Sequence, residues 1–237
     1  VLFLVLGALL LLFSGLVLAV VLGLLGLGAM AGGAGNTGYR QVEVVPGKAT
    51  KKIMIVSVSG IIHSGQTGPF SVGTSADRLQ QQLRWIARDD NVAAVILELN
   101  TPGGEVTASD EIHRAIQRLR RERNLPVIAC MRSVAASGGY YLAAGTDHIV
   151  ANRMTLTGSI GVIIGGYNYH DLLNKVGLEQ KLYHRGELKD LGNPARDPDS
   201  DSPAVQRRNR KDAEILQGLV DDTYEEFVEV VAKGRGL

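Results

Sequence analysis

The sequence predicts an α/β fold with a mostly parallel sheet and flanking helices. Apolar segments typical of strands alternate along the chain with amphipathic segments typical of helices. The strand candidates are almost continuously apolar, as in parallel sheets whose crossover connections are helices. Setting aside an apolar N-terminus leaves roughly 200 residues, which suits one medium-sized domain.

The N-terminal segment, residues 1–31, is apolar apart from Ser14. About 20 apolar residues span a bilayer, so we expect a retained transmembrane anchor. The alternative is a cleaved secretory signal ending in the small-x-small sequence of residues 29–31, but the apolar run is about twice the usual length of such a region. Residues 32–51 are expected to form a linker that opens with a glycine-rich stretch, and residues 52–237 the folded domain.

The expected elements of that domain follow from hydrophobic periodicity. We predict strands over residues 52–62, 92–99, 126–131, 148–151 and 180–183, with a glycine-interrupted strand or loop over 155–164. We predict helices over residues 75–90, from Thr107 as N-cap onward, from near Ser137, over 168–176 and over 203–231. A polar loop with prolines over residues 187–202 precedes the last helix.

Composition excludes several classes of protein. The net charge is +1, without the marked basic excess expected of a nucleic-acid binder. The single cysteine, Cys130, cannot form an intramolecular disulfide and is expected to be a small buried strand residue. No glycine-rich turn matches the phosphate-binding loop, and no histidine pair has metal-ligand spacing. We therefore expect neither a cofactor nor a metal.

Two glycine-rich turns each follow a strand and open a helix, at residues 101–104 and 135–139. In a parallel sheet such turns lie at the carboxyl ends of the strands, where active sites form. Together they could supply a nucleophile, Ser137, and an oxyanion hole. Tight packing without any chemistry is the alternative that these residues leave open.

A serine nucleophile needs a base. Five histidines are available for a Ser-His-Asp triad, but Gly-x-Ser-x-Gly is absent, because Ala135 stands two residues before Ser137. A lysine is the other option: burial can lower its pKa from about 10.4 towards roughly 7–8. The chain has eight lysines, and spacing does not choose among them.

Four segments stand out along the chain: Asn100–Gly104 (NTPGG), Ala135–Tyr141 (AASGGYY), Thr155–Val162 (TLTGSIGV) and Lys189–Asp190. In order and in kind, they resemble the SppA signal peptide peptidases. The resemblance runs from about Lys52 to the C-terminus and implies a fold like that of Clp protease and the crotonases. Family members usually continue with a further strand and helix, so we expect the chain to be a fragment at its C-terminal end.

The resemblance implies the site residues. It makes Ser137 the nucleophile and Lys189 the base of a Ser-Lys dyad, gives the oxyanion N–H groups to Gly104 and Gly138, and has Ser159 orient the lysine amine. The expected activity is that of a membrane serine endopeptidase that cleaves apolar peptides such as released signal peptides. The expected assembly is a homo-oligomeric ring on the bacterial cytoplasmic membrane, with the protease domain outside the cytoplasm. The alternatives are a crotonase-like acyl-CoA enzyme and a non-enzymatic membrane scaffold.

Overall fold

The computed structural model describes residues 41–47, 49–65 and 73–237, so the anchor expected at residues 1–31 lies outside the described residues. The chain divides into two units, Val1–Pro46 and Gly47–Leu237, and all the described helices and strands belong to the second. Within the described ranges, no helix combines the length and the apolar character needed to cross a membrane.

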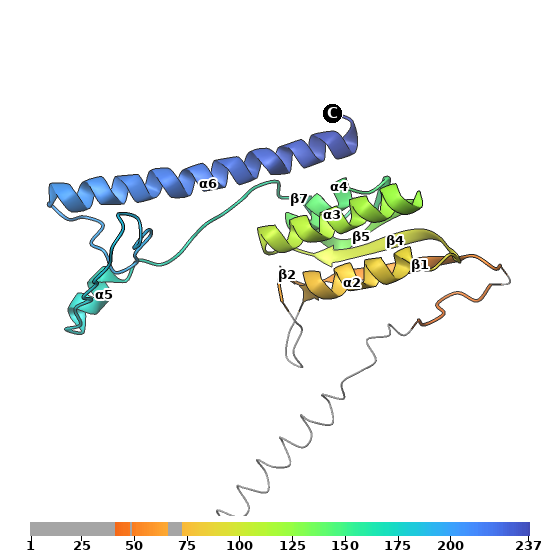
Figure 1. Cartoon of the computed structure of the whole chain (residues 1–237), viewed down its shortest axis with the longest axis horizontal. Coiled ribbons are helices and arrows are strands. Elements are labelled where there is room, and N and C mark those ends of the chain that lie inside the picture. Colours follow the sequence, from red (N-terminus) through yellow and green to blue (C-terminus); the bar gives the residue numbers. More distant parts are fainter. Residues whose placement is uncertain (1–40, 48, 66–72) are drawn as a thin grey trace, which may run out of the picture. The chain divides into compact units, whose positions relative to one another are not determined.

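A parallel sheet forms the centre of the second unit (Figure 1). Its strands in the described part are β1 (Lys52–Ser59), β4 (Val92–Thr101), β5 (Val127–Ala136), β6 (His148–Ala151) and β7 (Leu156–Gly158). They run in the order β1-β4-β5-β6, and β7 pairs with the C-terminal part of β5. A separate two-stranded pair consists of β2 (Ile62–His63) and β3 (Thr74–Ser75).

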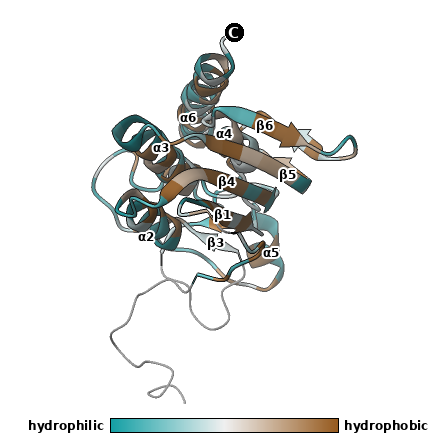
Figure 2. Ribbon diagram, turned by 90° about the vertical axis from the view of Figure 1, so that its right-hand side faces the viewer, coloured by the Kyte–Doolittle hydropathy of each residue, from teal (hydrophilic) through white to brown (hydrophobic). Residues whose placement is uncertain are grey.

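Helices α2 (Ala76–Ala87) and α3 (Val106–Arg123) pack against one face of this sheet. Helix α2 begins after Ser75, whose hydroxyl accepts a hydrogen bond from the Arg78 N–H. The core lies between the helices and the sheet, and its largest buried side chains include Leu83, Ile86, Leu97, Leu99, Ile112 and Ile116. Figure 2 shows the hydrophobic strands β4 and β5 beside helices with hydrophilic outer surfaces. On the opposite face of β1, Ile53 and Ile55 are exposed.

Three further helices complete the second unit: α4 (Gly138–Ala144), α5 (His170–Lys175) and α6 (Pro203–Arg235). The C-terminal half of α6 packs on α4 through a small apolar cluster of Tyr141, Ala144, Phe227 and Val231. The rings of Tyr141 and Phe227 meet edge to face, with 5.1 Å between their centroids. This contact is reinforced by Arg235, whose guanidinium donates to the Thr146 carbonyl at 2.8 Å.

The α/β fold with a parallel sheet and flanking helices confirms the prediction of fold class. Several local predictions were wrong. Residues 180–183 form no strand, because no neighbouring strand pairs with them. Residues 155–164, expected as a strand or loop, do form a strand over Leu156–Gly158, where β5 offers a partner, and loop elsewhere. The second helix is capped at Glu105 rather than Thr107, so it begins two residues earlier than Thr107 would place it.

Candidate active site

Ser137 occupies the junction at which β5 turns directly into α4. Its backbone has φ 51° and ψ −121°, a conformation that non-glycine residues rarely adopt and that costs about 1–3 kcal/mol. Two hydrogen bonds hold it there: the Ser137 N–H donates to the Gly158 carbonyl at 2.9 Å, and the Tyr141 N–H donates to the Ser137 carbonyl at 2.9 Å. The side chain makes no capping hydrogen bond to its own helix, so the hydroxyl is available for other chemistry.

The turn after β4 is fixed by a buried threonine. Thr101 Oγ1 donates to the Gly60 carbonyl at 2.5 Å and accepts from the Gly103 N–H at 3.0 Å. Gly103 has φ +96°, which favours glycine. A Cβ atom at this position would lie 2.6 Å from the Gly138 nitrogen and 2.9 Å from Ser137 Cβ. The two glycine-rich turns are therefore in direct backbone contact.

The N–H groups of Gly104 and Gly138 are both left without a hydrogen-bond partner among the described residues. Gly104 forms a parallel bridge with Ile62, in which Ile62 N–H donates to Gly103 O and Glu105 N–H donates to Ile62 O, both at 2.9 Å. This bridge engages the Gly103 carbonyl and the Glu105 N–H, and it leaves the Gly104 N–H without an acceptor. Gly138 is the first residue of α4, where the N–H has no intrahelical acceptor. Backbone N–H groups without an acceptor are the kind of donor that an oxyanion hole uses.

Glu105 and His63 flank this turn. The Ser64 N–H donates to Glu105 Oε2 at 2.7 Å, and hydrogen bonding to Ser64 lowers the pKa of that carboxyl. His63 Nδ1 lies 3.0 Å from the Ser64 carbonyl. Neither side chain hydrogen-bonds to Ser137. Both therefore belong to the wall beside the turn rather than to a serine–histidine pair.

Ser159 is brought next to the Ser137 backbone by β7. Gly158, whose carbonyl accepts the Ser137 N–H, immediately precedes it. Thr157 secures this strand by donating from Oγ1 to the Ala135 carbonyl at 2.8 Å. Ser159 is exposed and has φ 53°, a second non-glycine residue in the left-handed region beside the site. The described structure thus gathers four of the five predicted site residues: Gly104, Ser137, Gly138 and Ser159.

Lys189 is the fifth predicted site residue, and no described contact joins it to the other four. It is exposed, and its N–H donates to the Gly186 carbonyl at 3.4 Å. Its side chain forms no hydrogen bond or ion pair within the described ranges. The next residue, Asp190, is instead held firmly by arginines. As a single chain, the protein presents Lys189 on an anchored but open loop.

None of the histidines forms a hydrogen bond to Ser137 among the described residues. His113 packs against Tyr141 with 5.0 Å between ring centroids, and burial lowers its pKa. His170 contacts the Ala195 carbonyl through Nδ1 at 3.0 Å, far along the chain from the β5 turn. Also within those residues, no cluster of three histidine, cysteine or acidic side chains could hold a metal ion.

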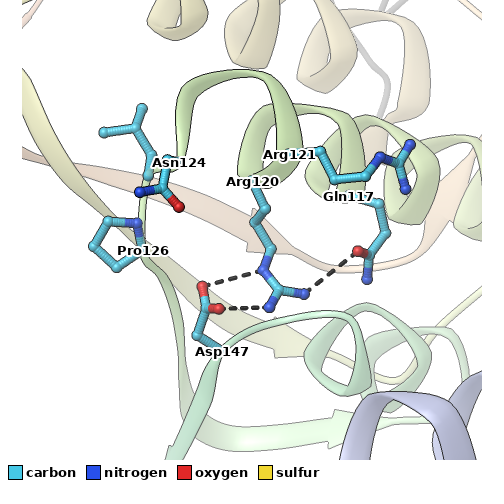
Figure 3. A pocket seen from close by; sticks show the side chains of 7 residues that line it. Gln117, Arg120, Arg121, Asn124, Pro126 and Asp147 are labelled. Carbon is cyan, nitrogen blue, oxygen red and sulfur yellow. Dashed lines mark hydrogen bonds and ion pairs between the residues drawn. The ribbon is translucent and has the colours of Figure 1, made fainter.

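A cavity of about 420 Å³ lies at the opposite edge of the sheet, near the start of β5 (Figure 3). Arg120 lies there and donates to both carboxylate oxygens of Asp147, at 3.1 and 2.5 Å, and to the Gly145 carbonyl at 2.7 Å. Asp147 in turn accepts the Val127 N–H at 2.8 Å. Through Asp147, these hydrogen bonds join α3 to β5. The cavity is separated from Ser137 by the length of β5.

Sequence reasoning did not identify the structural roles of Thr101 and Thr157. Thr101 ends β4 and Thr157 lies in the short strand β7, and each uses its hydroxyl to fix backbone beside the site. The available signal was a threonine next to a Pro-Gly-Gly sequence in one case and next to a glycine in the other. Such threonines commonly bond to nearby backbone.

Comparison with known proteins agrees with this geometry. The model of peptidase family S49 matches residues 119–237, and that of the Clp protease family matches residues 58–166. The chain belongs to peptidase family S49, the SppA-like serine proteases with a Clp protease/crotonase fold. This family membership favours a serine peptidase over the crotonase-like enzyme and the non-enzymatic scaffold as the interpretation of the site.

Among curated relatives, the Enterococcus faecium protein named "Putative signal peptide peptidase SppA" is 36% identical over 205 residues, covering 86% of this chain and 56% of the relative. A Synechocystis protein, "Putative protease slr0021", is 35% identical over 189 residues, covering 79% and 60%. The chain thus spans little more than half the length of these relatives.

A solved structure of the 1510-N membrane-bound stomatin-specific protease, in complex with a substrate peptide, is 30% identical in sequence. The match covers 50% of this chain and 49% of the solved chain, with a TM-score of 0.39.

Proposed function

We propose that this chain is a membrane-anchored serine endopeptidase that cleaves apolar peptides, such as released signal peptides, with a Ser137–Lys189 dyad. The observation that carries the proposal is the strained Ser137 turn, packed against a second turn whose Gly104 N–H, like that of Gly138, has no partner among the described residues. Strain of this kind persists where the surrounding structure enforces it, and it clusters at active sites.

The proposed acylation begins with the scissile carbonyl seated between the two turns. Ser137 Oγ attacks the carbonyl carbon while Lys189 Nζ accepts the hydroxyl proton. The N–H groups of Gly104 and Gly138 donate to the oxyanion that develops. The C–N bond then breaks, Lys189 returns the proton to the leaving amine, and an acyl-enzyme remains on Ser137. Water hydrolyses the ester in a second step with the same base.

Lysine serves as a base only when it is neutral, and its ordinary pKa is about 10.4. A desolvating pocket favours the neutral form of the amine, and the assembled site must supply such a pocket. Ser159 is proposed to accept or donate a hydrogen bond at the amine and so orient it, the role of the third group in a triad. Its place after Gly158, beside the Ser137 backbone, supports that assignment.

We propose that each Lys189 completes the site of a neighbouring subunit in a homo-oligomeric ring. Lys189 is exposed on its own chain and touches none of the other four site residues within the described ranges. A neighbour packed over its loop would exclude water and favour the neutral amine, the form that accepts a proton. In a cyclic ring each subunit can give its lysine to one neighbour and receive one from the other.

The proposed location is the bacterial cytoplasmic membrane, with the protease domain on its outer side and residues 1–31 as the anchor. The length of the apolar segment supports the anchor. Protease accessibility in spheroplasts tests the orientation: the domain should be digested before lysis, and protection until lysis would refute it.

Hydrolysis of a panel of apolar peptides tests the dyad. Ser137→Ala and Lys189→Ala should each abolish turnover without unfolding the protein. Matched controls are Ser133→Ala, an exposed serine on the same strand, and Lys181→Ala, an exposed lysine in the same segment, and both should keep wild-type rates. Unchanged turnover in purified Ser137→Ala protein would sink the proposal.

Mixing the two inactive variants tests the shared site. Ser137→Ala and Lys189→Ala chains are unfolded together in equal amounts and refolded. A shared dyad is intact when its serine and lysine come from complementary chains, which gives roughly a quarter of wild-type activity for random rings. An inactive mixture, with ring assembly confirmed by sizing, places both residues of the dyad in one subunit.

A further inference from the structure

Four charged side chains gather behind the loop that carries Lys189. We name Asp190, Arg196, Arg208 and Asp212 the loop clamp. Arg196 donates from Nη2 to Asp190 Oδ2 at 2.7 Å and from Nη1 to Asp212 Oδ2 at 2.6 Å. Arg208 donates to Asp190 Oδ1, and its Nε lies 3.5 Å from Asp212 Oδ1. Two residues come from the loop and two from α6, so the clamp joins the two segments.

The clamp also holds the loop backbone at Asp190 and at Gly192. Arg196 Nη2 donates to the Asp190 carbonyl at 2.8 Å, and the Gly192 N–H donates to Asp212 Oδ2 at 2.9 Å. Nearby, Asn209 Nδ2 donates to the Asp197 carbonyl at 2.9 Å. This stretch has neither helix nor strand, so hydrogen bonds from side chains hold its backbone in place of a regular ladder of backbone hydrogen bonds.

The clamp is electrically balanced and largely withdrawn from solvent. Its side chains are 7–18% exposed, and two carboxylates face two guanidiniums. Burial alone would raise the pKa of Asp190, but the hydrogen bonds from Arg196 and Arg208 hold it below its ordinary value. Buried ion pairs of this kind often stabilise a protein no better than apolar residues of similar volume, whereas they do impose a specific geometry.

We propose that the loop clamp positions Lys189 for proton transfer. The inference rests on the proposed role of Lys189 as the base. Lys189 directly precedes Asp190, whose carboxylate and carbonyl both accept hydrogen bonds from Arg196. These bonds fix the Cα of Lys189 relative to α6, while its side chain stays free. A general base must be held within about 0.5 Å of its productive place. The four clamp residues are positioning residues that act through Lys189.

Other charged groups border the loop without gripping the backbone of residues 189–190. His184 Nε2 lies 3.8 Å from Asp190 Oδ1, and Lys211 Nζ donates to Glu187 Oε1 at 2.9 Å. The Glu187–Lys211 pair is more exposed than the clamp and bonds only side chains. These groups are neighbours of the clamp rather than members of it.

Arg196→Lys and Asp212→Asn test the proposal in the full-length protein. Arg196→Lys keeps the charge but loses the planar fork that reaches both aspartates. Asp212→Asn removes one charge and weakens the hold on α6. The matched control, Asp147→Asn, breaks the ion pair with Arg120 at the far edge of the sheet. Active sites are counted with a fluorophosphonate probe, and kcat and KM are then measured per titrated site together with the Tm.

Positioning predicts that kcat per titrated site falls about 10- to 100-fold in both clamp variants, with KM little changed. Asp147→Asn should keep the wild-type kcat per site even if its Tm falls. A merely structural role would reduce the Tm and the number of titrated sites but leave kcat per site unchanged, and that result overturns the proposal. Wild-type turnover in Lys189→Ala would instead reject the proposed dyad, so the two failures are distinguishable.

Discussion

Gly104→Ala tests whether the first turn supplies part of the oxyanion hole. A Cβ atom at this position would lie 2.6 Å from the Ile62 nitrogen and closer still to its carbonyl oxygen, so the bridge must open. Opening it loses two backbone hydrogen bonds, each 2.9 Å long. At about 0.5–1.5 kcal/mol each, the loss is about 1–3 kcal/mol of stability. For a domain of this size that lowers the Tm by about 2–12 °C.

The effect on catalysis should be larger than the effect on stability. The same displacement moves the Gly104 N–H, and removal of one oxyanion donor typically lowers kcat about 10²- to 10³-fold. Peptide hydrolysis measured well below the Tm separates the two effects. Gly161→Ala is the matched control, because a Cβ atom there meets nothing within 4 Å. A Gly104→Ala protein with shifted Tm and kcat within about threefold of wild type would refute the assignment of this N–H to the oxyanion hole.

Three further outcomes are expected. Ser137→Gly and Ser137→Ala should both be inactive. In chemical denaturation, the glycine variant should be about 1 kcal/mol more stable than the alanine variant, because glycine tolerates φ 51°. Equal stabilities of the two variants would argue against backbone strain at Ser137. Lys189→Arg should not restore activity, since arginine stays protonated, and the wild-type rate should rise with pH as lysine loses its proton; a flat profile from about pH 6 to 10 would count against a lysine base. Burial alone would raise the pKa of Asp147, but the hydrogen bond from Arg120 lowers it overall. The carboxylate therefore stabilises the folded protein above its ordinary pKa of about 3.9, and this stabilisation is lost as the pH falls through the lower folded value. Asp147→Asn should accordingly have a Tm closer to wild type at about pH 3 than at pH 7, and an equal difference at both pH values would contradict this.

The sheet and the serine turn could be predicted because their signals are local. Continuous apolar runs identify β4 and β5, and small residues around Ser137 identify a tight strand-to-helix turn. The placement of the two glycine-rich turns at one edge of the sheet also follows from topology, because the carboxyl ends of parallel strands meet there. The structure confirms this placement, because the backbones of Gly103 and Gly138 are in contact.

The loop clamp could not be predicted, because it depends on which charged residues the loop brings opposite α6. Asp212 is buried in α6, where hydrophobic periodicity alone favours burial of Ala213 and Leu216. The N-terminal half of α6 packs on a polar loop rather than on the apolar core, so its buried positions follow charge pairing and not hydrophobic periodicity. Ala213 is exposed for the same reason.

The central claim is that Ser137, activated by Lys189, is the nucleophile, and covalent trapping tests it most directly. A fluorophosphonate probe is added to the full-length protein, and the labelled residue is located by peptide mass spectrometry. We predict stoichiometric labelling of Ser137, at a rate that rises with pH and falls at least about 100-fold in Lys189→Ala, with no labelling of Ser137→Ala. Labelling of another residue, or an unchanged rate at Ser137 in Lys189→Ala, would contradict the account.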